Sequence, residues 1–409
     1  MTRTWFATPA LLAAGVLVAS IGIRAQDPAA DEPAAQTEAQ APVYATPDDV
    51  HVRSGLTCQA CHGAPRPEST PDNPVFAPIA RTAIAQLCAR CHADAAYMRQ
   101  FAPQVRVDQY SQYLTSIHGQ QMAKGNDTVA TCSDCHNAHG ILQVRDTRSP
   151  VAPSNVARTC ARCHEDASRM DPFGRSSEVF AEWSTSVHAA ALLERGDTSA
   201  PTCNTCHGSH GATPPGVDAV ANVCAQCHVR EAELFRGSPK KALFDMMGQA
   251  DCLVCHNNHA IARPDDSWIG FESPAVCATC HSEDMGGAEV IRMFGEGLRT
   301  LREDTEAADA LVTRAETAGV LVDEGHLALA DAREAHVQLR VLVHAFANEP
   351  FTEVLAEGRA AVERADQAGN AGLEELDFRR GGLAVATLFI LGFLVTLAIK
   401  IRRLPPVEG

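Results

Sequence analysis

Apolar residues are arranged in two different ways along this chain of 409 residues. Two stretches, residues 9–23 and 381–399, are almost entirely apolar. In residues 288–380, which are rich in Ala, Glu, Leu and Arg, apolar side chains such as Leu298 and Leu301 instead recur at helical spacing. The pattern predicts a group of amphipathic helices that ends in an apolar helix.

Breaks in the pattern divide the C-terminal part into three helices. Gly319 marks a turn, helical character resumes around Asp323, and it stops near Pro350. A third helix, which starts just after that proline, is expected to continue into the apolar stretch. We therefore predict a helical hairpin or stalk over residues 285–380 and a transmembrane helix over residues 381–399.

The two apolar stretches place the chain in an exported, membrane-anchored class. Residues 381–399 number 19 and carry no charge, enough to cross a hydrocarbon core of about 30 Å. Arg3, the first apolar stretch and a small-residue cleavage site fit a signal peptide over residues 1–25, with an uncleaved anchor as the alternative. Residues 26–50, rich in Ala, Pro, Gln and acidic residues, are expected to form a flexible linker. The expected location is the inner membrane, with the body in the periplasm and the basic tail, residues 400–409, in the cytoplasm.

The cysteines carry the chemistry. All sixteen fall in eight C-x-x-C-H segments, the attachment sequence for c-type haem, in which two thiols bond the vinyl groups and the histidine binds the iron. A disulfide scaffold or zinc sites would not require a histidine after every second cysteine. We therefore predict eight covalently bound haems c. The thioether ligands are Cys58, Cys61, Cys88, Cys91, Cys132, Cys135, Cys160, Cys163, Cys203, Cys206, Cys224, Cys227, Cys252, Cys255, Cys277 and Cys280, and the proximal ligands are His62, His92, His136, His164, His207, His228, His256 and His281.

Residues 51–284 are expected to form the haem-binding head. They provide about 29 residues for each predicted haem, too few to bury an ordinary apolar core. The haems themselves must then form the core, stacked close together and surrounded by short helices and loops. The fold class is therefore mainly α with little or no sheet: an irregular multihaem head, a long-helix stalk and one C-terminal transmembrane helix.

Histidines outside the eight segments are candidates for the second, distal axial ligand of each iron. Three of them follow a segment in the pattern C-x-x-C-H-x-x-H, and each precedes another C-x-x-C-H segment. A histidine three residues beyond a proximal ligand cannot easily bind the same iron, so we expect it to bind the next haem. This rule assigns His139 to the haem of His164, His210 to that of His228, and His259 to that of His281.

Two further histidines occur in the pattern S-x-H shortly before a C-x-x-C-H segment. We assign His118 to the haem of His136 and His188 to the haem of His207, with a neighbouring haem as the alternative in each case. His51 is expected to serve one of the first two haems. The head thus offers six distal histidines for eight irons.

One haem of the first pair and the haem of His256 are then short of a ligand. A third S-x-H position, which begins at Ser238, carries Lys240 in place of histidine. If the second stalk helix folds back antiparallel to the first, its far end returns towards the haems, and His344 becomes the favoured ligand for His256. Lys240 is the next candidate, followed by Met246 or Met247. His336 lies about 12 Å further along the helix, and His326, near the distant turn, is expected to be solvated or in the core.

The repeated S-x-H, C-x-x-C-H-x-x-H and C-x-x-C-H motifs, followed by helices and a terminal span, resemble the membrane-anchored multihaem cytochromes c of bacterial respiratory chains. The resemblance covers most of the exported body and the anchor. It implies electron transfer between a membrane quinol-oxidising donor, often a cytochrome b, and periplasmic or outer-membrane acceptors. Lys240 departs from the repeated pattern.

Two functions fit these observations. The first is an electron-transfer conduit without catalytic residues, favoured by the nearly complete set of distal ligands and by the anchor. The alternative resembles the octahaem reductases of nitrite, hydroxylamine or tetrathionate, which need one haem with an exchangeable or Lys-ligated site. The sequence contains no C-x-x-C-K segment, which removes one signature of nitrite reductases.

Overall fold

The computed structural model describes residues 46–70, 74–214 and 216–403. The predicted signal peptide and nearly all of the predicted linker lie outside the described residues, as do residues 404–409 of the predicted tail. Within the described ranges the secondary structure is helical and contains no strand, which confirms the predicted fold class.

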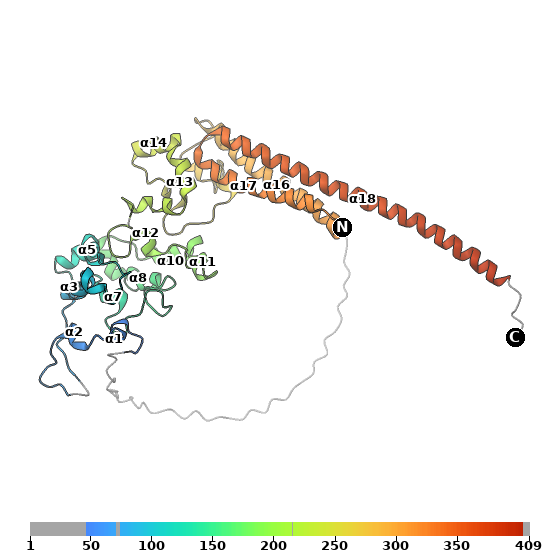
Figure 1. Ribbon diagram of the computed structural model, residues 1–409. Helices are drawn as coiled ribbons and strands as arrows, with labels where there is room; N and C mark the ends of the chain where they lie inside the picture. The colour runs from blue at the N-terminus through green and yellow to red at the C-terminus, as the bar shows by residue number, and fades with distance from the viewer. Residues whose placement is uncertain (1–45, 71–73, 215, 404–409) are drawn as a thin grey trace, which may run out of the picture. The chain divides into compact units, whose positions relative to one another are not determined.

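The part of the chain that holds the C-x-x-C-H segments consists of short helices joined by loops (Figure 1). The α-helices here have four to twelve residues, because each is interrupted by the next ligand-bearing loop. The helices are α1 (Val50–Arg53), α2 (Cys58–His62), α3 (Arg81–His92), α4 (Ala95–Met98), α5 (Gln109–Thr115), α6 (Ile117–Ala123), α7 (Cys132–His136), α8 (Val156–His164), α9 (Ala167–Met170), η1 (Asp171–Phe173), α10 (Val179–Ser184), α11 (Val187–Leu193), α12 (Cys203–His207), η2 (Val220–Gln226), α13 (Val229–Arg236), α14 (Pro239–Met247), α15 (Leu253–His256), η3 (Asp266–Trp268) and η4 (Val276–Thr279).

These helices form four repeats, each with two C-x-x-C-H segments. Every repeat opens with a buried polar residue at the N-cap of a short helix: Asp49 for α1, Ser116 for α6, Ser186 for α11 and Ser238 for α14. In the first three repeats the side chain of this residue accepts a hydrogen bond from the first turn, which fixes where the helix begins. The repeat therefore starts at this cap, and the opening helix carries the next candidate ligand.

Consecutive repeats are joined by hydrogen bonds at these same opening helices. In the first joint the N–H of Val50 donates to the carbonyl of Ile141 at 2.8 Å, and the N–H of Ile141 donates to Asp49 at 2.8 Å. In the second joint the N–H of Ala212 donates to the hydroxyl of Thr115, just before α6, at 3.4 Å. In the third joint the N–H of Val187 donates to the carbonyl of Ile261 at 2.9 Å. In each joint a loop of the later repeat thus holds the start of the repeat before it.

The C-terminal part is a bundle of three helices that run side by side (Figure 1): α16 (Ala288–Thr317), α17 (Asp323–Leu342) and α18 (Asn348–Arg402). A short turn, η5 (Val343–Ala345), connects α17 to α18. The periodic apolar residues form the core, and the fully buried side chains include Leu301, Val312, Leu329, Leu339 and Phe351.

Glycines let the bundle helices approach each other closely. A Cβ atom on Gly358 would lie 2.8 Å from a methyl carbon of Leu301, and one on Gly297 would lie 2.9 Å from the ring of Phe351. Gly319 has a φ of 87° in the turn between α16 and α17, a conformation that favours glycine. The expected turn at this residue is therefore present.

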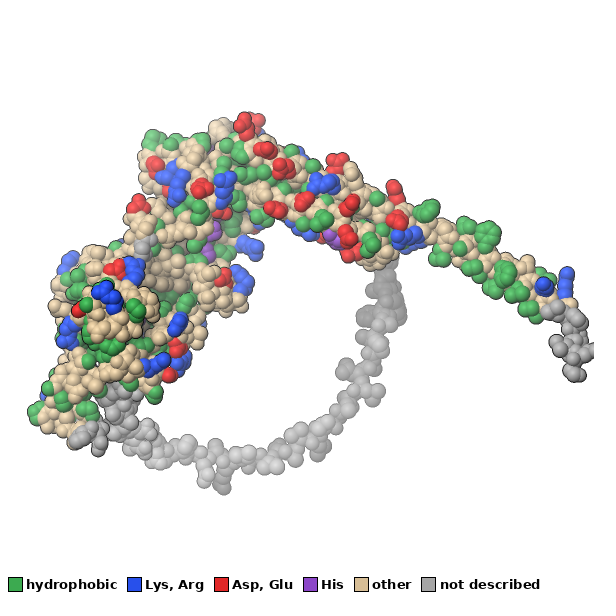
Figure 2. Space-filling view, in the orientation of Figure 1, with side chains coloured by type: hydrophobic (Ala, Val, Ile, Leu, Met, Phe, Trp, Pro, Cys, Tyr) green, Lys and Arg blue, Asp and Glu red, His purple; other side chains and the backbone are tan. Residues whose placement is uncertain are grey.

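The far end of α18 differs from the bundle in composition. It is one continuous helix, it is long and apolar enough to cross a membrane, and its apolar window is fully exposed. Leu388 and Phe389 are 70% and 75% exposed, and Figure 2 shows apolar side chains gathered along this end of the helix. Residues 381–399 thus lack any protein surface to pack against within the described chain.

Replacing Leu301 with Ala should lower the free energy of unfolding by about 3 kcal/mol, because the deletion leaves a cavity in a fully buried position. Leu327→Ala on α17, where the side chain is 69% exposed, is the matched control and should change stability by less than about 0.5 kcal/mol. Denaturant unfolding followed by far-ultraviolet circular dichroism measures both values. Equal effects of the two variants would contradict the assigned core.

Candidate haem sites

Each C-x-x-C-H segment has a local geometry that suits one haem. Helices α2, α7 and α12 extend from the first cysteine of a segment to its histidine. Residues i, i+3 and i+4 of a helical turn share one face, so both thiols and the imidazole lie on the same side. None of the sixteen cysteines is fully buried, so each side chain can be reached by a haem vinyl group.

The residue directly after the first segment of every repeat has a positive φ, in the left-handed half of the backbone map. Gly63, Asn137, Gly208 and Asn257 have φ values of 72°, 68°, 80° and 66°. Glycine adopts a positive φ without steric cost, and asparagine tolerates it better than most other residues. The helix therefore stops directly after the histidine, and the chain turns away from it.

The histidines of the segments stand opposite other histidines. Seven of the eight face a second imidazole with the ring centroids 6.0 to 6.5 Å apart. The pairs are His51–His92, His62–His139, His118–His164, His136–His210, His188–His228, His207–His259 and His256–His344.

This spacing fits an iron bound between two imidazoles. With metal–nitrogen bonds of about 2.0 Å on opposite sides of one ion, the ring centroids would be roughly 6.3 Å apart. Two rings packed directly against each other would be closer. The donor set and the separation are therefore those of a bis-histidine haem, and the residues fit the predicted group.

The pairing differs from the sequence-based assignment of His139, His210 and His259. Each lies beside the first histidine of the preceding repeat rather than beside the next segment along the chain. The left-handed residue after each first segment explains the difference, because it sends the following loop back onto the preceding repeat. The correct partners are His62 for His139, His136 for His210 and His207 for His259.

The favoured sequence-based assignment of the S-x-H histidines also differs from the structure, by one C-x-x-C-H segment. His118 faces His164 and His188 faces His228, so each serves the second segment of its own repeat, which agrees with the neighbouring-haem alternative. His51 faces His92 in the same way, which agrees with its assignment to one of the first two haems. Its cap, Asp49, takes the place of the serine, so the motif Asp49-Val50-His51 is a signal that could have identified this repeat.

The last repeat uses two other residues. His256 has no following repeat to supply an imidazole and faces His344 from the turn after α17, as the favoured sequence-based candidate requires. Lys240 lies beside His281 instead of His256, with the amine 2.7 Å from Nε2. Met246 and Met247 are 76% and 55% exposed, and no ring or ligand contact is described for them.

Successive sites touch one another through their cysteines. The side chain of Cys88 lies beside that of Cys132, and Cys160 lies beside Cys203 in the same way. Cys224 and Cys252 form the third such pair. These contacts lie where one repeat meets the next, so the second site of a repeat is adjacent to the first site of its successor.

Burial favours the neutral imidazole at most of these positions. Desolvation lowers the pKa of nine of the paired histidines below the usual range, and neighbouring imidazoles or Lys240 lower some of them further. A neutral imidazole offers a free nitrogen lone pair to a metal ion. The nine are His92, His118, His136, His164, His188, His207, His210, His256 and His281.

Asp266 fixes the bundle to the head next to the His256–His344 pair. Its carboxylate, only 10% exposed, accepts hydrogen bonds from Arg302 at 3.2 Å, His336 at 3.1 Å and Arg340 at 2.9 Å. Trp268, two residues further along η3, packs against the His256 ring with a centroid separation of 5.6 Å. The cluster therefore sets the position of the end of α17, from which His344 extends.

The other stalk histidine is part of an exposed ion pair. His326 lies 3.2 Å from Glu316 and is 44% exposed, which agrees with the expected solvated position near the distant turn. It faces none of the C-x-x-C-H histidines.

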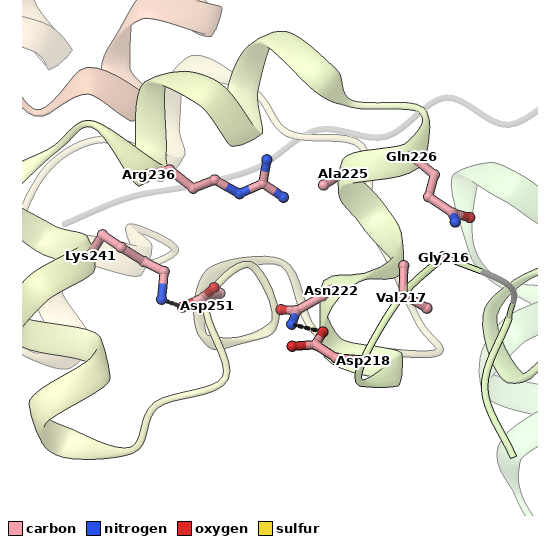
Figure 3. Close-up of a pocket in the computed structure, with 9 residues that line it drawn as sticks. All are labelled: Gly216, Val217, Asp218, Asn222, Ala225, Gln226, Arg236, Lys241 and Asp251. Carbon is pink, nitrogen blue, oxygen red and sulfur yellow. Dashed lines mark hydrogen bonds and ion pairs between the residues drawn. The ribbon is translucent and has the colours of Figure 1, made fainter.

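A polar pocket with a volume of about 440 Å³ lies outside the histidine pairs, between η2, α13 and α14 (Figure 3). Its side chains are paired with one another: Lys241 lies 3.6 Å from Asp251, and Asn222 donates to Asp218 at 2.7 Å. The pocket offers no ring, thiol or amine towards a paired histidine, and we assign it no function.

Replacing Asp266 with Ala should lower the free energy of unfolding by about 3 kcal/mol, because it leaves three partly buried donors without their acceptor. Asp331→Ala is the matched control, since this carboxylate binds Arg364 in an exposed pair and should contribute less than about 1 kcal/mol. Denaturant unfolding of the purified holoprotein gives both values. An effect of Asp266→Ala no larger than that of the control would rule out the anchoring role.

Comparisons with known proteins point to the same chemistry. The family model of cytochrome c3 matches residues 50–165 and 197–282, and the matched segments contain all eight C-x-x-C-H motifs. The multihaem cytochrome MtrA of Shewanella baltica (strain OS185) is 24% identical over 240 residues, which make up 50% of this chain and 67% of that protein. No solved structure matches the chain. Residues 50–282 are therefore similar to multihaem cytochromes c of the cytochrome c3 type.

Proposed function

We propose that this protein is an octahaem c-type cytochrome that carries electrons between a membrane donor and an acceptor in the periplasm or outer membrane. The single observation that carries the proposal is the set of paired nitrogen ligands: each of the eight C-x-x-C-H histidines faces a second nitrogen donor. The seven sites with an imidazole on both sides leave no room for a substrate, which favours electron transfer over catalysis.

The residues divide into three tasks at each site. The two cysteines would hold the haem covalently, the histidine of the segment would bind from one side, and the facing residue would bind from the other. The bound haem supplies a one-electron redox centre. The protein supplies the ligand positions, the exclusion of water and the spacing between sites.

Contacts between successive sites support transfer along a row. The thiol contacts between repeats, such as Cys88 with Cys132, bring the attachment points of neighbouring sites together. Within repeats, the second cysteines of the two segments also lie near each other, as Cys135 and Cys163 do. An electron would thus meet a neighbouring site at every step from the first segment to the last.

The long helix α18 supports a membrane anchor. From its first residue, Asn348, to Gly381 it spans 33 residues, or roughly 50 Å at 1.5 Å per residue, before the apolar segment begins. In the proposed arrangement the anchor is in the inner membrane and the haem domain is in the periplasm. The donor, a quinol-oxidising cytochrome or similar protein, would then meet the head beyond the hydrocarbon core.

Haem content and electron uptake test the proposal directly. Intact-mass measurement should show eight covalently added haems, and reductive titration should take up eight electrons per chain. When the reduced protein is mixed with a soluble ferric acceptor in a stopped-flow instrument, all haems should be reoxidised. Their reoxidation should be coupled, because electrons pass from one haem to the next. Fewer haems, or haems that reoxidise independently of one another, would overturn the proposal.

Replacing His344 with Ala should convert one low-spin haem of the eight to high spin, because His256 then loses its facing imidazole. Electron paramagnetic resonance of the oxidised protein measures this change. The matched control is His326→Ala, which removes an exposed histidine at the opposite end of α17 and should leave the spectrum unchanged. A low-spin spectrum in the His344 variant would show that another residue completes the site.

A further inference from the structure

The last C-x-x-C-H site differs from the other seven in the chemistry of its facing residue. Seven histidines face an imidazole, whereas His281 faces the primary amine of Lys240 at 2.7 Å. Two nitrogen ligands on opposite sides of one iron are about 4 Å apart, so the amine would have to withdraw by about 1.3 Å. The four-carbon stem of lysine is flexible enough to allow this movement.

Lys240 occupies the same structural position as the ligands of the other repeats. It stands two residues after the buried cap Ser238, as His118 stands after Ser116 and His188 after Ser186. Both of those histidines face the second segment of their own repeat, and so does Lys240. Lys240 therefore occupies the position of a distal ligand and is not a surface charge that happens to lie near His281.

The helix that carries Lys240 is held less firmly than its counterparts. Helices α6 and α11 each bury two residues, whereas α14, like α1, buries none. In the first and third repeats the N–H of Val50 or Val187 donates to the following repeat, but the corresponding residue in α14 is Pro239, which has no N–H to donate. No repeat follows, so the brace that holds the earlier helices has no equivalent here.

The stalk covers the amine from one side only. Phe346, two residues after His344, places its ring centroid 5.7 Å from the Lys240 amine. This phenylalanine has a φ of 49°, a left-handed conformation that is costly for a bulky residue and must be maintained by its surroundings. Further along α14, Leu243 and Met246 are 47% and 76% exposed.

We propose that Lys240 is the exchangeable sixth ligand of the haem at Cys277–His281, so that small iron ligands such as carbon monoxide can enter the row at this site alone. The inference rests on the proposed octahaem function. The exchange breaks the bond between iron and the lysine amine and forms a bond between iron and the incoming ligand, without any change in electron count. The other seven sites do not admit such ligands, because their facing imidazoles lie on segments held by a neighbouring repeat or by the helical bundle.

Carbon monoxide binding to the fully reduced holoprotein tests the inference. The wild-type protein should bind one carbon monoxide per chain, and near-infrared magnetic circular dichroism of the oxidised protein should show one histidine–amine haem besides bis-histidine haems. Lys240→Ala should turn one haem high-spin and increase the rate of carbon monoxide binding at least tenfold. Lys240→His should restore a bis-histidine spectrum and abolish the binding.

The neighbouring lysine provides the control. Lys241→Ala removes an adjacent amine that pairs with Asp245 and Asp251, and it should behave as wild type in both measurements. Wild-type protein that binds no carbon monoxide, or a Lys240→Ala variant with an unchanged spectrum, would overturn the inference. A holoprotein with eight haems that are all bis-histidine would overturn it while leaving the proposed electron transfer intact, whereas fewer than eight haems would refute the proposed function itself.

Discussion

Two ligands on opposite sides of one metal ion must come from chain segments that approach from opposite directions, and this requirement organises the head. A helical turn supplies the two thiols and one imidazole of each site, but it cannot reach around to the other face. The facing nitrogen therefore comes from elsewhere: from the opening helix of the same repeat for the second segment, and from the next repeat for the first. Each repeat is incomplete without its successor, and the joints between Val50 and Ile141 and between Val187 and Ile261 hold that arrangement.

The helical architecture could be predicted from the sequence, and the comparisons support the haem chemistry that the motifs predict. Sixteen cysteines in eight segments predict covalent haem, and the periodic apolar residues from Leu298 to Ala315 predict the buried face of the bundle, which the structure confirms. Pairing could not be derived in the same way, because it depends on the direction in which the chain leaves each segment. The left-handed Asn137 reverses that direction, and nothing in the spacing of His139 distinguishes the preceding site from the following one.

The helical bundle is also part of the site and not only a support. Because no fifth repeat exists, the first segment of the last repeat takes its facing imidazole from the turn after α17. Asp266 joins that turn to the head through residues of α16 and α17, so packing in the bundle and ligand geometry are coupled. The same turn places Phe346 over Lys240, which makes both sites of the last repeat dependent on one short connection.

Borrowing a ligand from the next unit has a consequence for how such a chain can change in length. A whole repeat inserted between two others would receive its missing nitrogen ligand from the repeat that follows it in the chain. It would in turn supply one to the repeat that precedes it. Only the final unit needs a special terminus, here a histidine from the bundle and a proline where the first and third units carry a bonded N–H. Row length could therefore increase or decrease in steps of two haems by duplication or deletion within the gene, while the connection to the bundle stays constant.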